Sequence, residues 1–133
     1  KGYKQALIHH DLFIKDDFIL SLEAKENNNL LLNNYLNANP SLSAVVVTDD
    51  YVATSVIRVC RERNIHIPNE LSIISFNNSF IAEVSHPSLT SVDTQVFQLG
   101  SEAAKCLIDE INESSEYKKS IIIPTIIQKR EST

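Results

Sequence analysis

Two adjacent aspartates, Asp49 and Asp50, directly follow an apolar run and stand at the start of an amphipathic pattern. Two asparagines, Asn77 and Asn78, follow the next strongly apolar run along the chain. Carboxylate and amide side chains so placed could act as acid and base, hold a metal ion, bind the hydroxyl groups of a ligand, or cap a helix. These roles make different demands on the elements that position the residues.

The pattern favours ligand binding for Asp49 and Asn77 and helix capping for Asp50. In an open α/β sheet the carboxyl ends of parallel strands share one edge, and ligands bind along it. If the two apolar runs are neighbouring parallel strands, Asp49 and Asn77 lie side by side there. A helix start needs one capping side chain, so a second polar cluster on the same rim exceeds what capping requires. Carboxylate and amide groups that form paired hydrogen bonds suit the neighbouring hydroxyls of a sugar.

Catalysis and metal binding fit these residues poorly. Two carboxylates that cleave a glycosidic bond must flank it at a defined separation, whereas adjacent residues at a helix start point in different directions. The four histidines are scattered and give no Ser–His–Asp order. A metal site at the two aspartates lacks a third ligand at a recognisable spacing. A phosphate-accepting receiver domain would need an aspartate where Asn77 stands. The sequence therefore predicts no enzyme, no metal and no cofactor.

Composition is typical of a globular domain, and it argues against a membrane-spanning segment and against nucleic-acid binding by these residues. The 133 residues are 43% hydrophobic and 22% charged, which is typical of one ordinary domain. No apolar run approaches the roughly 20 residues that span a bilayer, and the sequence predicts no signal peptide within these residues. The net charge of −5 repels phosphate, so any contact with DNA must come from residues outside this sequence. The chain opens on Lys1 rather than methionine, which suggests a fragment of a longer protein.

Glycine and cysteine usage narrows the class further. With only two glycines the chain has no Gly-rich phosphate loop, which excludes Walker and Rossmann nucleotide sites. Cys60 and Cys106 both fall on apolar helical stripes. We therefore expect free, buried thiols in a reducing cytoplasm rather than a disulfide.

Apolar periodicity divides the chain into alternating helices and strands. Predicted helices cover 2–10, 26–39, 51–64 and 96–112, and predicted strands cover 18–22, 44–48, 71–76, 89–92, 121–123 and 125–128. The β-branched run 44–48 is typical of a strand buried on both faces of a parallel sheet. Pro124 interrupts the last pieces and places them at a sheet edge. The alternation predicts an α/β fold with a mostly parallel sheet and helices on both faces.

Several segments together resemble one family of bacterial regulators. The stretch IPNELSIISFNNSFIAEVSHPSLTSVDTQVFQLGSEAAKCLIDEI, residues 67–111, resembles the effector-binding core of the lactose-repressor/galactose-repressor (LacI/GalR) family. The opening KGYKQAL, the VVVTDDYVA segment and the terminal KREST are similar to the same core, in order and over the whole chain. Within the family, the SFNNS segment looks closest to the maltose-operon repressors of Gram-positive bacteria.

The resemblance implies a two-lobed core of the type I periplasmic-binding-protein kind, preceded by a helix-turn-helix headpiece and a hinge helix. Residues 1–133 would form the C-terminal part of that core, without the headpiece and nearly all of the first lobe. The chain would cross between lobes near 92–95 and 118–124, so that 96–116 belongs to the missing lobe. The apolar stripe of that helix must then be covered by folding back or by a second copy.

The resemblance also assigns candidate residues. Asp49 falls where the family usually has an effector-binding asparagine, and Asn77 falls where an effector-binding aspartate is common. Asp50 matches the aspartate beside the first. Val96 occupies a position where some members place an aromatic near the ligand, although a valine there fits a simple helix core equally well. Dimerisation surfaces of the family include the helix after Asp50 and the loop 79–88, which points to three interface residues: Tyr51, Ser55 and Phe80.

The resemblance implies the effector-sensing and dimerisation part of a cytoplasmic, sugar-responsive transcriptional regulator. The expected partners are a maltose-like carbohydrate, a second copy of the chain, and operator DNA through the missing headpiece, with no membrane. The sequence favours a repressor of a maltose, malto-oligosaccharide or other carbohydrate operon. Two alternatives stay open. One is the sugar-binding component of an ABC transporter, which shares the fold, and the other is a catabolite regulator that responds to a phosphoprotein co-repressor.

Overall fold

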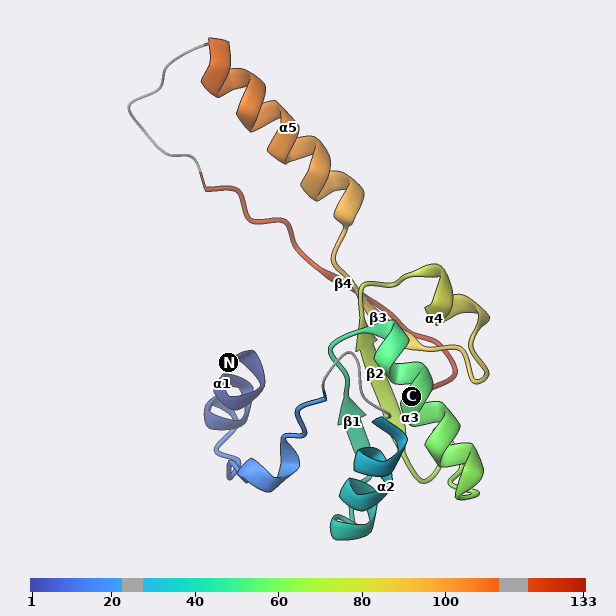
Figure 1. The fold of residues 1–133 in the computed structure, drawn as a ribbon. Helices are drawn as coiled ribbons and strands as arrows, with labels where there is room; N and C mark the ends of the chain where they lie inside the picture. Colours follow the sequence, from blue (N-terminus) through green and yellow to red (C-terminus); the bar gives the residue numbers. More distant parts are fainter. Residues whose placement is uncertain (23–27, 113–119) are drawn as a thin grey trace. The chain divides into compact units, whose positions relative to one another are not determined.

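The computed structural model describes residues 1–22, 28–112 and 120–133 (Figure 1). The chain divides into two compact units, Lys1–Ser41 and Leu42–Thr133. The candidate residues at 49, 50 and 77 all belong to the second unit.

The first unit contains two α-helices with a short turn of 3-10 helix between them. These elements are α1 (Gly2–His9), η1 (Asp16–Phe18) and α2 (Asn28–Ala38). The Tyr35 hydroxyl donates to the Phe18 carbonyl at 2.9 Å and so joins η1 to α2. The predicted strand 18–22 is wrong: the Ile19 amide donates to the Asp16 carbonyl, which closes a tight turn, and 19–22 form no strand. The first two residues of the predicted helix 26–39 lie outside the described residues.

The second unit is built on a four-stranded sheet in the order β1-β2-β3-β4. Its strands are β1 (Ala44–Val46), β2 (Ser72–Phe76), β3 (Thr90–Asp93) and β4 (Ile126–Gln128). The first three strands are parallel, and β4 pairs antiparallel with β3. The predicted mostly parallel α/β fold is confirmed, and β4 lies at an edge as Pro124 indicated. Helices on both faces of the sheet stay a prediction.

Burial reaches the central strands and not β1. Ile73 and Ser75 of β2 and Thr90 and Ser91 of β3 are almost completely buried. By contrast, Val46 of β1 is 61% exposed. The prediction of a strand covered on both faces at 44–48 is therefore wrong. A β-branched run indicates a preference for extended, pleated structure, whereas burial on both faces also requires a packed layer over each face of the strand.

Helix α3 (Asp50–Glu62) packs against β2 with its apolar stripe inward. The buried stripe comprises Ala53, Val56, Ile57, Val59 and Cys60. A short helix α4 (Phe80–Val84), which the sequence indicated as a loop, follows β2 and buries Ala82. Cys60 is a free, buried thiol as predicted, and burial raises its pKa. Cys106 is also free but only half-buried.

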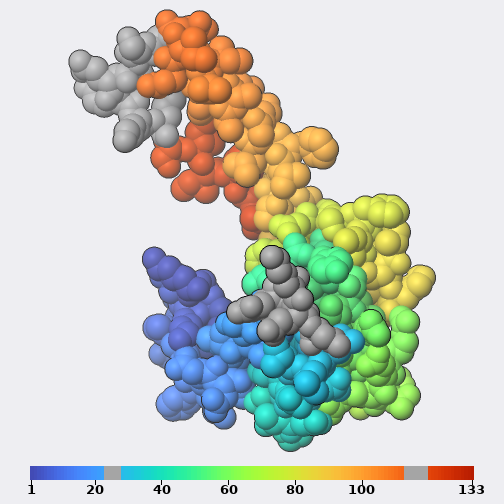
Figure 2. All heavy atoms as spheres, viewed as in Figure 1, coloured from blue at the N-terminus to red at the C-terminus, as the bar shows by residue number. Residues whose placement is uncertain are grey.

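Helix α5 (Val96–Asn112) has the predicted bounds and contains no buried residue. Figure 2 shows the surface of α5 in orange. Several apolar side chains of this helix are exposed: Val96, Phe97, Leu99, Leu107, Ile108 and Ile111. The chain leaves β3, forms α5 and returns into β4 beside the strand that it left (Figure 1). Among the described residues, no helix is both long and apolar enough for a membrane span.

The C-terminal tail ends inside the sheet rather than in solvent. Ser132 is completely buried, and its Oγ donates to the Ile73 carbonyl at 2.6 Å and accepts from the Thr90 amide at 2.8 Å. The Ile73 amide in turn donates to the Ser132 carbonyl at 2.8 Å. The terminal KREST residues therefore join β2 to β3 beyond their own ladder.

Candidate functional site

The three parallel strands end along one rim of the sheet, and each end carries a polar residue. Asp49 follows β1, Asn77 follows β2, and Asp93 closes β3. The Asn77 side-chain amide donates to Asp49 Oδ2 at 2.8 Å. The prediction that these two residues lie side by side is therefore confirmed in geometry.

The helix cap is Asp49 and not Asp50, so the predicted division between the two aspartates is wrong in this respect. Asp49 has an extended backbone, and its Oδ1 accepts from the Tyr51 amide at 2.7 Å. Asp50 is already the first residue of α3. A capping side chain must leave from a non-helical residue just before the first turn, which only Asp49 satisfies.

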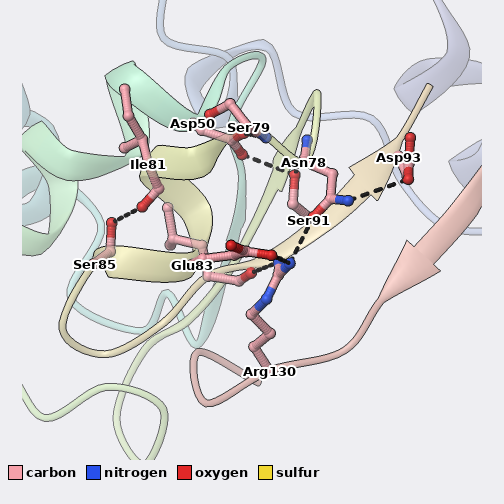
Figure 3. Close-up of polar contacts among 10 residues, drawn as sticks. Asp50, Asn78, Ser79, Ile81, Glu83, Ser85, Ser91, Asp93 and Arg130 are labelled. Atoms are coloured by element: carbon pink, nitrogen blue, oxygen red, sulfur yellow. Dashed lines mark hydrogen bonds and ion pairs between the residues drawn. The ribbon is translucent and has the colours of Figure 1, made fainter. Parts of the chain in front are cut away.

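Asp50 instead points into the sheet, where it orients the rim. Its side chain is 1% exposed. Its Oδ1 accepts from the hydroxyls of Ser75 at 2.5 Å and Ser91 at 2.8 Å, and its Oδ2 accepts from the Ser79 amide at 2.7 Å. One carboxylate thus joins α3 to β2, to β3 and to the start of α4. Figure 3 shows Asp50 with two of these partners, Ser79 and Ser91. The orienting role predicted for Asp50 agrees with these contacts.

The hydrogen bonds decide the protonation state of Asp50. Burial raises the pKa of the carboxyl group, because the charged form loses its hydration. The hydrogen bonds from Ser75, Ser79 and Ser91 act in the opposite direction and outweigh burial, so the pKa lies below its ordinary value of 3.8. Asp50 is therefore a buried anion at neutral pH.

Asn77 and Asn78 form the turn that ends β2. Both have left-handed backbones, with φ of 94° and 47°. Asparagine adopts this conformation more readily than most residues. The Asn77 backbone amide donates to the Val92 carbonyl at 2.9 Å, which keeps the turn against β3. The side chain of Asn77 is exposed.

Asn78 is the centre of a second polar cluster beside this turn. Its Nδ2 donates to Asp93 Oδ2 at 3.1 Å, and its Oδ1 accepts from Arg130 Nη2 at 2.6 Å. Figure 3 shows Asn78 between these two partners, with the Arg130 guanidinium also directed at Glu83, 3.8 Å away. Arg130 donates further to the Leu89 carbonyl at 2.7 Å.

Sequence reasoning named Asn78 beside Asn77 but missed the other supporting residues: Ser75, Ser91, Asp93 and Arg130. Hydroxyl groups inside apolar strands were the one available signal, because a buried serine requires a polar partner. Nothing local to Arg130 links it to a turn 52 residues earlier in the chain.

The remaining predicted site residues lie in the second unit without forming part of the polar pair. Val96 begins α5, three residues beyond β3, and is 57% exposed. Tyr51 and Phe80 are 70% and 74% exposed at the starts of α3 and α4, and Ser55 is half-buried. Their roles toward a ligand or a second copy stay predictions.

The site offers hydrogen bonds rather than metal ligands. Within the part of the chain that the structure describes, no group of three or more His, Cys, Asp or Glu side chains could hold a metal ion. At the exposed rim, the Asp49 carboxylate supplies acceptors beside an Asn77 amide that both donates and accepts. Such a pair can bind a neutral molecule that carries adjacent hydroxyl groups.

A family model described as a periplasmic binding protein-like domain matches residues 1–133. The chain therefore belongs to the periplasmic binding protein-like domain family. This class agrees with the parallel sheet and with a ligand rim at the carboxyl ends of its strands.

The similar proteins are transcriptional regulators. The regulator DegA of Bacillus subtilis is 30% identical over 139 residues, which cover all of this chain and 40% of DegA. IdnR of Escherichia coli is 31% identical over 121 residues, which cover 91% of this chain and 36% of IdnR. Catabolite control protein A of Priestia megaterium is 28% identical over 134 residues. The chain spans about two fifths of the length of these curated relatives.

Solved structures agree with the fold. The CelR–cellobiose complex has a TM-score of 0.88 at 22% identity and covers 99% of this chain and 41% of CelR. A LacI-type transcriptional regulator from Bacillus cereus has a TM-score of 0.82 at 29% identity and covers 99% of this chain and 47% of the regulator. The predicted resemblance to LacI-family regulators is confirmed.

Proposed function

We propose that this chain is the effector-binding wall and dimerisation part of a carbohydrate-responsive transcriptional regulator, a repressor of a carbohydrate operon. The hydrogen-bonded pair Asp49–Asn77 at the exposed rim carries the proposal. A sugar hydroxyl can donate to the Asp49 carboxylate while its neighbour accepts from the Asn77 amide or donates to its carbonyl. We propose effector-binding roles for Asp49 and Asn77 from this chemistry, and for the exposed Val96 an apolar contact at the margin of the site.

The buried anion beneath the rim supports a preformed site. Because Asp50 holds the starts of both α3 and α4, the groups that meet the ligand are already oriented before binding. Pre-organisation lowers the ordering cost of association. In CelR, a protein of the same fold, the ligand is cellobiose, so the fold accommodates a disaccharide. A maltose-like effector is one member of this class.

The regulatory step requires a second wall. We infer that 96–116 belong to a further lobe, which would cover the exposed apolar stripe of α5, and that operator DNA is bound by a headpiece outside these residues. A sugar that contacts both lobes favours one relative orientation and so changes DNA affinity. Such a protein acts in the cytoplasm by binding and performs no catalysis.

The relatives favour a regulator over a transporter component, because those named above are transcriptional regulators or a catabolite control protein. Catabolite control protein A among them keeps a phosphoprotein co-repressor as the second candidate. Retained response to the phosphoprotein without any sugar response would favour this candidate.

The effector assignment is tested on the full-length protein that contains this chain. Maltose, cellobiose, glucose and lactose are titrated against its complex with operator DNA by fluorescence anisotropy. We expect one sugar to change DNA affinity, and Asp49→Ala to weaken binding of that sugar at least tenfold while operator affinity without sugar stays within twofold. The matched control is Glu62→Ala, which removes a carboxylate from the far end of α3, about 18 Å along the helix. If none of the sugars acts, or if both variants respond alike, the assignment fails.

Self-association is predicted to depend on the exposed aromatic residues at the starts of α3 and α4. Phe80→Lys places a charge where Phe80 is 74% exposed, and we expect it to weaken the homodimer at least tenfold in sedimentation equilibrium. Phe13→Lys, at a phenylalanine of the first unit that is 93% exposed, is the control. Equal dimer affinity in wild type and Phe80→Lys would place the interface elsewhere.

A further inference from the structure

A continuous line of polar contacts runs from the C-terminal tail to the segment that follows β3. Arg130 donates to the Asn78 side-chain oxygen, and the Asn78 side-chain nitrogen donates to Asp93. The other oxygen of Asp93 accepts from the Gln95 amide at 2.7 Å. Gln95 has a left-handed backbone with φ of 50° and stands directly before α5.

The line continues to the chain that returns from α5. The Gln95 side-chain amide donates to the Pro124 carbonyl, two residues before β4 begins. Asp93 and Ile126 are also partners in the β3–β4 ladder. Gln95 therefore contacts both segments that connect α5 to the sheet. Asp93 links Gln95 to Asn78 in the turn that follows β2.

Asn78 also belongs to the turn that carries the candidate ligand residue. Its backbone amide donates to Ser91 Oγ at 3.0 Å, and Ser91 donates to the buried Asp50. Asn77 is its direct neighbour in the same left-handed turn. A backbone shift at Asn78 moves Asn77 with it, because the two residues are consecutive and both have positive φ, which leaves the turn few alternative conformations.

We propose that Asn78 is a positioning residue that couples the ligand rim to both connections of α5 through Asp93 and Gln95, while Arg130 holds the Asn78 side chain from the segment that follows β4. The proposal rests on the function proposed above and adds the route by which movement of α5 reaches Asn77. Ligand binding at Asn77 favours one position of the Asp93 and Gln95 side chains. It therefore favours one conformation of the two segments that connect α5 to the sheet. Asn78 itself does not touch the ligand.

The donor and acceptor pattern allows a swap experiment in the full-length protein. Asn78→Asp keeps an acceptor for Arg130 but sets two carboxylates against each other. Asp93→Asn sets two side-chain amides together, so that either Asn78 or Gln95 loses its acceptor. The double variant N78D/D93N restores the contact between positions 78 and 93 with donor and acceptor exchanged. It also keeps an acceptor at position 78 for Arg130 and one at position 93 for the Gln95 backbone amide. The matched control is Glu83→Gln, which removes the carboxylate charge beside the Arg130 guanidinium and leaves the line from Arg130 through Asn78 to Asp93 intact.

Two readouts follow each variant. The first is coupling, measured as the ratio of sugar dissociation constants with and without operator DNA. The second is amide hydrogen exchange at Gln95, which needs no ligand. We expect each single variant to reduce coupling at least fivefold and to accelerate exchange at Gln95 at least tenfold. The double variant and Glu83→Gln should stay within twofold of wild type on both readouts.

The outcomes separate this proposal from the function on which it rests. If the single variants lower only the melting temperature, with coupling and Gln95 exchange unchanged, Asn78 is merely structural and the proposal is wrong. The proposal is equally wrong if the coupling and the Gln95 exchange rate of the double variant are no closer to wild type than those of the more affected single variant. If the wild type responds to no sugar, the proposed function fails, and exchange at Gln95 then decides alone whether the mechanical link exists.

Discussion

Replacing Asp50 with alanine should lower the free energy of unfolding by about 3–5 kcal/mol, the largest effect that we expect from one side chain in this chain. The substitution leaves the Ser79 amide and the hydroxyls of two buried serines without their acceptor. It also opens a cavity at a site that is 1% exposed. Denaturant titration of the purified protein measures the change.

Its neighbour supplies the matched control for Asp50. Asp49→Ala removes a carboxylate of the same type, but one that caps a helix and accepts from the Tyr51 amide near the surface. A lost cap costs about 1 kcal/mol. If the two variants are destabilised equally, Asp50 is no more important to the fold than a surface cap, and the buried carboxylate does not organise the rim.

Asp50→Asn separates charge from shape, because the amide has nearly the same volume. Since the folded-state pKa of Asp50 lies below its ordinary value, the anion stabilises the protein above about pH 4, and this contribution is lost as pH falls through the folded-state pKa. We therefore expect the stability difference between wild type and Asp50→Asn to be constant near neutral pH and to shrink below pH 4. Glu70 and Glu131 also have lowered pKa values, but they are present in both proteins. Their contributions to the pH dependence of stability therefore cancel in the difference.

Replacing Ser132 with alanine should destabilise the protein by about 2–4 kcal/mol. The serine hydroxyl bonds the Ile73 carbonyl and the Thr90 amide in a position without solvent exposure, so alanine leaves a buried donor and a buried acceptor unpaired. Thermal unfolding, with the enthalpy measured by calorimetry, gives the change. Faster hydrogen exchange at the Thr90 amide should accompany it.

The control lies three residues earlier in the same tail. Lys129 is exposed, and Lys129→Ala should change stability by no more than about 0.5 kcal/mol. A loss below 1 kcal/mol in Ser132→Ala would mean that the two strands do not depend on the tail. The KREST residues would then be a family resemblance without a structural role.

Most helices and strands of the second unit were predictable because they obey local rules, although the predicted strand 121–123 does not form. The apolar stripe of α3 and the bounds of α5 follow from the helical period, and β2 and β3 follow from apolar runs of strand length. The meeting of Asp49 and Asn77 also follows, since parallel strands present their carboxyl ends together. The short helix α4 was not predicted, because five residues are too few to reveal a helical periodicity of apolar side chains.

The division of labour between the two aspartates was decided by tertiary structure. Local pattern cannot tell which of two adjacent carboxylates turns inward, because the serines that bind Asp50 come from strands 25 and 41 residues further along the chain. The exposure of Val46 in β1 was decided in the same way, because cover over the face of a strand comes from segments elsewhere in the chain. Sequence by itself determined the elements and the rim, because these depend on spacing within each segment. Only the packed structure decided the cap, the buried anion and the anchored tail, because these depend on partners that distant segments supply.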